Sequence, residues 1–290
     1  MHERSSIMLD MNRLPFPKQV AVVAALVEGN SIRSTCRMTE VAKGTVLALL
    51  KALGVACAEF HDRAVRNVRS RRIQCDEIWQ FCYAKEKNVP ADKKGQFGYG
   101  DVWTWTAVDA DTKLTIGYLV GKRDAGCAFE FMQDLAGRLA NRVQLTTDGL
   151  KVYLEAVEGA FGCDIDYATL VKIYGKAQEE IRYSPAVCLG ATAAVITGNP
   201  DRAKISTSYV ERSNLTMRMS MRRFTLLTNG FSKKVENLRH AVALYAVHYN
   251  FCRVHQTLRV TPAMEAGLTT RIYDVQDIVG LLQASDCSAA

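Results

Sequence analysis

Glu211 is an isolated acid in a basic part of the chain. Between residues 202 and 239, nine lysines and arginines are accompanied by two acids, a net charge of +7. A helix over residues 206–223 would place four polar side chains on one face: Glu211, Asn214, Arg218 and Arg222. A carboxylate among cations fits a site where the acid binds a divalent metal and the cations bind phosphates. The simpler alternative is an ion pair between Glu211 and one of the two arginines on a solvated helix.

Two further acids lie where strands are expected. Residues 72–83 are rich in β-branched and aromatic residues, as a central strand is, and carry Asp76 and Glu77 in the middle. Residues 143–148 are typical of a short strand that ends at Asp148, and the carboxyl ends of strands in open α/β sheets gather ligands. Alternation along a strand sends Asp76 and Glu77 to opposite faces, so only one of them is expected to act as a ligand.

Turn residues and periodicity predict the elements between and after these acids. A strand pair with a tight turn at residues 109–111 is followed by alternating helices and strands. Asp101, Asp109 and Asp111 lie at the hairpin ends and are expected to be turn acids. The predicted ranges are strands 101–109 and 112–121, helix 125–140, helix 150–161, strand 167–174 and then an irregular segment before the helix with Glu211.

This order of elements resembles the ribonuclease H-like catalytic domain of DDE transposases and integrases. Four motifs look specifically like those of the insertion-sequence-one-type transposases: Cys-Asp-Glu-Ile-Trp at 75–79, Thr-Asp-Gly at 147–149, Tyr-Val-Glu-Arg-Ser-Asn at 209–214, and the segment 249–264. The resemblance covers residues 72–268, and it is specific because the four motifs occur in the right order. It implies an α/β fold with a catalytic domain at 67–230. The remaining residues are expected to form a helix-turn-helix domain at 1–66 and a C-terminal helical extension at 231–290.

The resemblance also implies an activity, which is DNA cleavage and strand transfer without a covalent protein intermediate. Asp76, Asp148 and Glu211 would bind two Mg²⁺ ions, for which Mn²⁺ can substitute, with Asp76 bridging both. The implied partners are double-stranded DNA, as the terminal inverted repeats of an element and as target DNA, and further copies of the chain in a synaptic complex. Two alternatives stay open: a nuclease of the same fold without strand transfer, and a catalytically silent DNA-binding protein.

The N-terminal sixty residues predict three helices, at 16–28, 31–37 and about 43–60. Ser31 can cap the second helix, and the third has a buried stripe with Lys43 and Thr45 facing outward. A short helix, a turn and a longer helix are typical of a helix-turn-helix. Together with a nuclease-like domain, this pattern favours recognition of element ends.

Other DNA contacts are expected from basic and polar residues outside the helix-turn-helix. Five arginines between residues 63 and 72 form a run without acids, which either lies on the DNA backbone or is a solvated boundary. His255 follows a predicted helix at 232–254 and either contacts a phosphate or is a structural histidine; a last helix is expected at 274–282. The DNA-binding set outside the helix-turn-helix is Arg69, Arg71, Arg212, Asn214, Arg218, Arg222 and His255.

The composition agrees with this reading. The chain of 290 residues is 48% hydrophobic, with an isoelectric point near 8.9 that suggests a polyanionic partner. Its nine cysteines are scattered without a Cys-x-x-Cys pair, and no secretory signal or apolar run near 18 residues is evident. We therefore expect a reduced, cytoplasmic, nucleoid-associated protein without structural zinc and without a membrane partner.

Overall fold

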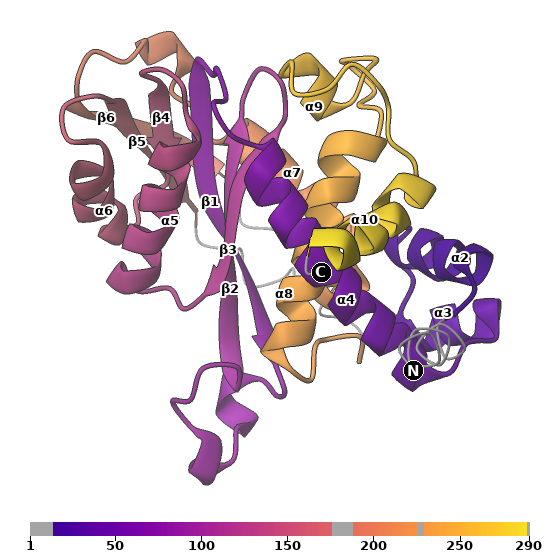
Figure 1. The fold of residues 1–290 in the computed structure, drawn as a ribbon. Helices are drawn as coiled ribbons and strands as arrows, with labels where there is room; N and C mark the ends of the chain where they lie inside the picture. The colour runs from indigo at the N-terminus through magenta and orange to yellow at the C-terminus, as the bar shows by residue number, and fades with distance from the viewer. Residues whose placement is uncertain (1–13, 176–187, 226–228, 289–290) are drawn as a thin grey trace.

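A six-stranded mixed sheet forms the centre of the computed structural model, which describes residues 14–175, 188–225 and 229–288 (Figure 1). In sheet order the strands are β3 (Thr115–Gly121), β2 (Gly100–Asp109), β1 (Arg72–Cys82), β4 (Gln144–Thr147), β5 (Asp166–Tyr174) and β6 (Cys188–Thr197). Strands β1, β4 and β5 run parallel, and the pairs β1–β2, β2–β3 and β5–β6 are antiparallel. The protein is therefore a mixed α/β protein, as predicted.

The pairing of β1 with β4 brings two of the predicted acids to the same level of the sheet. The last pair in this parallel register joins Cys75 to Thr147. The residue after each of these is an aspartate, so Asp76 and Asp148 are neighbours across the two strands. A parallel register keeps equivalent positions side by side, which makes the two carboxylates close without any loop having to fold back.

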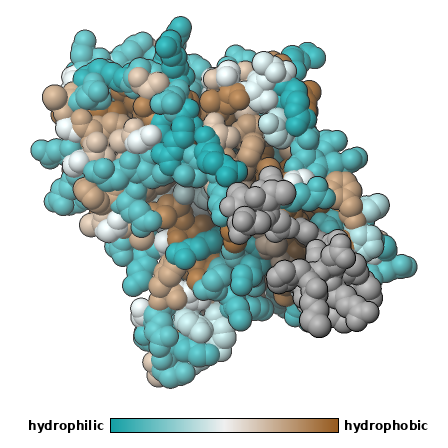
Figure 2. All heavy atoms as spheres, viewed as in Figure 1, coloured by the Kyte–Doolittle hydropathy of each residue, from teal (hydrophilic) through white to brown (hydrophobic). Residues whose placement is uncertain are grey.

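Helices cover both faces of the sheet, and Figure 1 shows α5 and α6 on one side with α4 and α8 on the other. Their bounds are α2 (Phe16–Val27), α3 (Ile32–Thr39), α4 (Lys43–Ala64), α5 (Ala125–Arg138), α6 (Val152–Phe161), α7 (Ser208–Ser220), α8 (Val235–Val247), α9 (Pro262–Glu265) and α10 (Val275–Ser288). In the view of Figure 2 the surface is mainly hydrophilic, with hydrophobic patches on the side of α5 and α6, where Phe129 and Leu154 are exposed.

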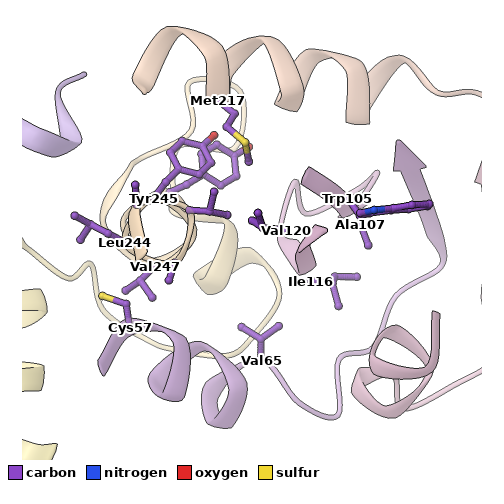
Figure 3. Close-up of a cluster of buried hydrophobic side chains, with 14 of the residues drawn as sticks. Cys57, Val65, Trp105, Ala107, Ile116, Val120, Met217, Leu244, Tyr245 and Val247 are labelled. Atoms are coloured by element: carbon purple, nitrogen blue, oxygen red, sulfur yellow. The ribbon is translucent and has the colours of Figure 1, made fainter. Parts of the chain in front are cut away.

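Helix α8 lies at the centre of the second layer. In Figure 3 it is seen end-on, with Cys57 of α4 on one side, Met217 of α7 on another and Val120 of β3 on a third. Gly54 of α4 contacts His240 of α8 so closely that a side chain there would collide with it. The buried side chains of α4, α8 and the sheet belong to one core cluster, so the predicted boundary at residue 66 is not a gap in the packing.

The N-terminal helices follow their predicted positions. Helix α3 begins where expected, and the Ser31 hydroxyl accepts a hydrogen bond from the Ser34 amide at 3.0 Å. Among the described residues only α4 is long and apolar enough to span a membrane by length and composition. Its composition has another cause, because Val46, Leu50 and Leu53 of this helix are buried in the protein core.

Some predicted ranges differ from the structure, and three of the differences bear on the residues around the site. Helix α7 ends at Ser220 rather than at residue 223, because Met221 is buried with an extended backbone, and a 3-10 turn, Arg222–Phe224, follows. The helix expected at 232–254 is α8, which continues as a π-helical turn, His248–Cys252. Strand β6 occupies part of the segment that was expected to be irregular; residues 176–187 of that segment lie outside the described residues.

Candidate active site

The three predicted acids line one open pocket, which we call the acid pocket. Asp76 comes from the middle of β1, Asp148 directly follows β4, and Glu211 lies in the first turn of α7. Arg123, Lys172 and Arg218 are the basic residues in its lining. Segments that are more than sixty residues apart in the chain therefore line the same pocket.

Glu77 also belongs to the acid cluster, which the alternation rule did not predict. One carboxylate oxygen from each of Asp76, Glu77 and Asp148 lies within 4.8 Å of the others. Asp76 and Glu77 do contact helices on opposite faces, but Asp148 sits just beyond the end of β4, where a side chain can approach both. Both adjacent acids therefore lie near Asp148, and the expectation that only one of them acts as a ligand stays a prediction.

Asp76 is held by two polar residues that belong to other elements. The Asn214 amide of α7 donates to the Asp76 carboxylate at 2.8 Å, and the Thr106 hydroxyl of β2 donates to the Asn214 carbonyl at 3.0 Å. Burial, together with the nearby charges of Asp148 and Glu211, raises the pKa of Asp76 to about 6. The carboxylate is thus fixed in direction and crowded by negative charge.

Gln74 positions the helix that carries Glu211. Its side-chain carbonyl accepts hydrogen bonds from the backbone amides of Tyr209 and Val210 at 2.8 and 3.0 Å. These amides belong to the first turn of α7, which has no partner for them within the helix. Gln74 and Asp76 are two residues apart on β1 and therefore lie on the same face of the strand. Through this face β1 caps the start of α7 with Gln74 and binds Asn214 of α7 with Asp76.

Glu77 is buried on the other face of β1 and is bound by two side chains. It accepts hydrogen bonds from the Tyr153 hydroxyl of α6 and from Arg123 Nε, the latter at 3.0 Å. Burial is the main cause that raises the pKa of Glu77 to about 7. Arg123 Nη2 also lies 3.5 Å from Asp148, so this guanidinium links the two carboxylates. Sequence analysis did not identify Arg123, because no local pattern marks it.

Glu211 forms an ion pair, but not with the arginines considered from the sequence. Lys172 of β5 places its ammonium nitrogen 2.5 Å from both carboxylate oxygens, and the Thr207 hydroxyl donates to one of them at 2.6 Å. Glu211 lies outside the group of three acids whose oxygens are within 4.8 Å. Its charge nevertheless contributes to raising the pKa of Asp76, so the two carboxylates act on each other across the pocket.

The residues of α7 that were predicted to bind DNA have different positions. Asn214 is only 4% exposed and is bonded to Asp76, so we assign it to positioning this carboxylate rather than to DNA contact. Arg218 is exposed and lines the acid pocket. Arg222 lies beyond the end of α7 and lines a different groove, so the four-residue stripe predicted for one helix does not exist.

The other candidate DNA contacts lie at the surface. Arg212 is exposed, and its charge acts with Lys113 and Arg253 to lower the pKa of His255, for which partial burial is the largest cause. Lys43 and Thr45 are exposed at the start of α4. These positions are accessible to a nucleic acid.

The arginine run before β1 is only partly available for such a contact. Arg66 pairs with Asp62, and Arg72 pairs with Asp111, so acids from elsewhere in the chain neutralise two of its members. Arg69 and Arg71 are exposed, and neither forms an ion pair with another described residue.

The donor set of the acid pocket fits a divalent cation that prefers oxygen ligands. Asp76 and Asp148 offer converging carboxylates, and Glu211 lines the same pocket. Mg²⁺ and Mn²⁺ bind to such carboxylates and retain several waters. Burial and then the neighbouring carboxylates raise the pKa of Asp76, and a cation between the carboxylates relieves this crowding, so the residues present suit the ion.

No family model and no curated protein sequence matches the chain. Among solved structures, a piggyBac transposase synaptic complex with hairpin DNA is similar, with 10% identity, a TM-score of 0.39, and coverage of 93% of this chain and 70% of that one. Two Mos1 transposase structures, a paired-end complex with the left transposon end and a strand transfer complex, give TM-scores of 0.25 and 0.24 at 13% and 14% identity. Each of these matches covers 54% of this chain and 58% of the Mos1 chain. TM-scores below 0.5 do not establish a shared fold, so the functional assignment depends on the residues of the acid pocket.

Proposed function

We propose that this protein is a DDE transposase, which cleaves DNA at the ends of a mobile element and joins the freed ends to target DNA. The observation that carries the proposal is the convergence of Asp76, Asp148 and Glu211 in one open pocket beside exposed cations. The acids also follow one another through the strand, hairpin, helix, strand and helix order on which the resemblance to ribonuclease H-like transposases rests. We include in the proposal the helix-turn-helix at α3 and α4, a synaptic oligomer and a nucleoid location.

The side chains of the acid pocket have distinct proposed tasks. Asp76, Asp148 and Glu211 would hold Mg²⁺ or Mn²⁺, which activates a water or a 3′-hydroxyl and stabilises the leaving oxygen when it is bound. Asn214 keeps Asp76 in one orientation through its 2.8 Å hydrogen bond. Arg218 lines the pocket and provides positive charge for the phosphate of the reacting DNA strand.

The proposal is tested by replacing Glu211 with Gln, which keeps the shape of the side chain and removes the charge that binds metal. On DNA with the inverted repeats that flank the gene, Glu211→Gln should reduce cleavage and end joining by about a thousandfold or more in Mg²⁺. DNA affinity should be unchanged or slightly higher. Glu158→Gln is the matched control, because Glu158 is an exposed acid on α6, and it should behave like the wild type.

Lys172→Met separates a metal ligand from an ion pair. If the Lys172–Glu211 pair serves only the fold, then both substitutions lower the melting temperature and neither affects the chemistry. If Glu211 is a ligand, only Glu211→Gln abolishes the reaction. Wild-type cleavage without joining would identify the nuclease alternative, and binding without cleavage would identify the silent DNA-binding protein.

A further inference from the structure

A second charged surface lies beyond the end of α7, between the first residues of α3 and α4 and the segment that leads into α8. We call it the basic groove. Six cations line it, and no acid belongs to its lining. They are Arg33, Lys43, Arg222, Arg223, Lys233 and Lys234. One wall thus comes from the proposed helix-turn-helix. The other comes from residues that follow α7 and lead into α8.

Within the part of the chain that the structure describes, the cations of the basic groove have no carboxylate partners. Over residues 14–175, 188–225 and 229–288, none of the six forms an ion pair, whereas Arg66, Arg138 and Arg142 elsewhere pair with aspartates. Arg223 is half-buried and donates to the Ser232 hydroxyl at 2.8 Å, and its burial lowers the pKa of the guanidinium to about 10. A half-buried cation without an acid is unfavourable unless an anion approaches it.

The groove also concentrates positive charge where it is otherwise disfavoured. Lys43 is the first residue of α4, whose first turn contains no acid, so a cation stands at the positive end of the helix dipole. Lys233 lies near Arg33, and both burial and this like charge lower the pKa of Lys233. An anionic ligand between the walls would relieve the repulsion and would also meet the free amides at the start of α4.

We infer that the basic groove binds the sugar–phosphate backbone of a DNA duplex, and that it is the same duplex whose reacting phosphate enters the acid pocket. The second half of this inference rests on the proposed function. A phosphate backbone carries regularly spaced negative charge and releases counterions when lysines and arginines contact it. The groove offers such contacts from two walls, so the duplex would be held jointly by the N-terminal helices and by the residues around α8.

Helix α7 sets the separation between the two contacts. Glu211 lies in its first turn and Ser220 is its last residue, and nine residues at 1.5 Å each span about 14 Å. Successive phosphates of one strand are about 3.4 Å apart along the duplex axis, so for a duplex that lies along α7 this distance corresponds to about four nucleotides. The groove should therefore contact phosphates about four nucleotides from the reacting bond.

The salt dependence of DNA binding tests the groove itself. We would replace one exposed lysine on each wall, in the double variant Lys43→Gln/Lys234→Gln, and measure affinity for a fluorescent duplex between 50 mM and 300 mM NaCl. The slope of log K against log salt should fall by about 1.8, because each phosphate contact contributes about 0.9. The control is Lys87→Gln/Lys94→Gln, which removes the same charge from exposed lysines outside the groove and should leave the slope unchanged.

A neutral methylphosphonate in the duplex tests the position. Placed about four nucleotides from the bond that the wild type cleaves, it should weaken binding by the wild type and have no further effect on the groove variant. An unchanged slope in Lys43→Gln/Lys234→Gln overturns the groove assignment, whatever the cleavage result. A wild type that never cleaves, but whose groove variant loses slope, supports the groove as a DNA site and overturns the transposase proposal.

Discussion

The acid pocket lies along α7 and the basic groove lies beyond the end of this helix, and their charged side chains are held in different ways. In the acid pocket each carboxylate has a partner within the protein: Asn214 for Asp76, Arg123 for Asp148 and Lys172 for Glu211. In the basic groove the six cations have no acid partner among the described residues. The negative charges of the acid pocket therefore have partners within the protein, whereas the basic groove keeps an excess of positive charge.

This difference suits the acid pocket to holding reacting atoms in a fixed geometry and the basic groove to binding DNA. Side chains that are bonded to their neighbours keep their positions before any ligand arrives, which chemistry at a defined atom requires. Exposed lysines and arginines without partners adjust to a backbone and contribute binding energy that depends on salt. We therefore expect substitutions in the acid pocket to change reaction rates and substitutions in the basic groove to change DNA affinity.

The largest effect should come from Asp148→Asn, compared with the groove variant Lys43→Gln/Lys234→Gln. Asp148→Asn removes a charge that binds metal, so the single-turnover cleavage rate at saturating DNA should fall by about a thousandfold or more, with DNA affinity unchanged. The groove variant should show the reverse, with weaker binding and a near-normal rate once DNA is saturating. If both variants lose rate and affinity together, the two regions do not have separate tasks.

A third polar cluster serves as a reference, because it is closed to solvent and does not line the acid pocket. His61 is 2% exposed, its Nε2 lies 3.2 Å from the Thr115 carbonyl, and Asn250 bonds to the same backbone unit. Burial, and then the charge of Arg138, lower the pKa of His61 from 6.5 to about 4. The folded state thus disfavours the charged form of this histidine.

The sign of the pH effect follows from this lowered pKa. Above pH 6.5 His61 is neutral in the folded and the unfolded state, so it does not change the free energy of unfolding. Between pH 6.5 and about 4 His61 binds a proton in the unfolded chain but stays neutral in the folded chain. The free energy of unfolding should therefore fall over this window, by about 3 kcal/mol at most. Urea titrations at pH 7.5 and pH 4.5 should show this loss in the wild type and a smaller one in His61→Gln, with the cleavage rate at pH 7.5 unchanged. An equal loss in both proteins would show that His61 is not the group responsible.

A smaller effect is expected from Asn214→Ala, which removes the hydrogen bond that orients Asp76. Partners of metal ligands typically contribute 10- to 100-fold in metal affinity or activity, so cleavage should weaken by about that factor and recover partly at high Mg²⁺. Leu215→Ala, at an exposed neighbour on α7, is the control and should behave like the wild type. A loss of DNA affinity with a normal rate at saturating DNA would instead return Asn214 to the DNA-binding set.

Several parts of the fold could be predicted because they depend on neighbouring residues. Ser31 caps α3, and the Asp109 carboxylate accepts hydrogen bonds from the amides of residues 111 and 112, as expected of a turn acid. Gln74 could have been identified too, since it shares a strand face with Asp76. Strand β6 could not, because both of its faces are exposed and no buried alternation marks it.

By itself, the sequence predicted most of the order of the elements, without β6, several caps and turns, and the three acids that line one pocket. Only the tertiary structure decided which partners those acids have, that Glu77 joins them, and that Arg222 belongs to another surface. The physical reason is the distance along the chain between the residues that interact. Caps, turns and alternation depend on atoms within a few residues, whereas Lys172 meets Glu211 across 39 residues of chain. Whether such a pair forms depends on strand register and on the residue where a helix ends, which are set by packing of the whole core.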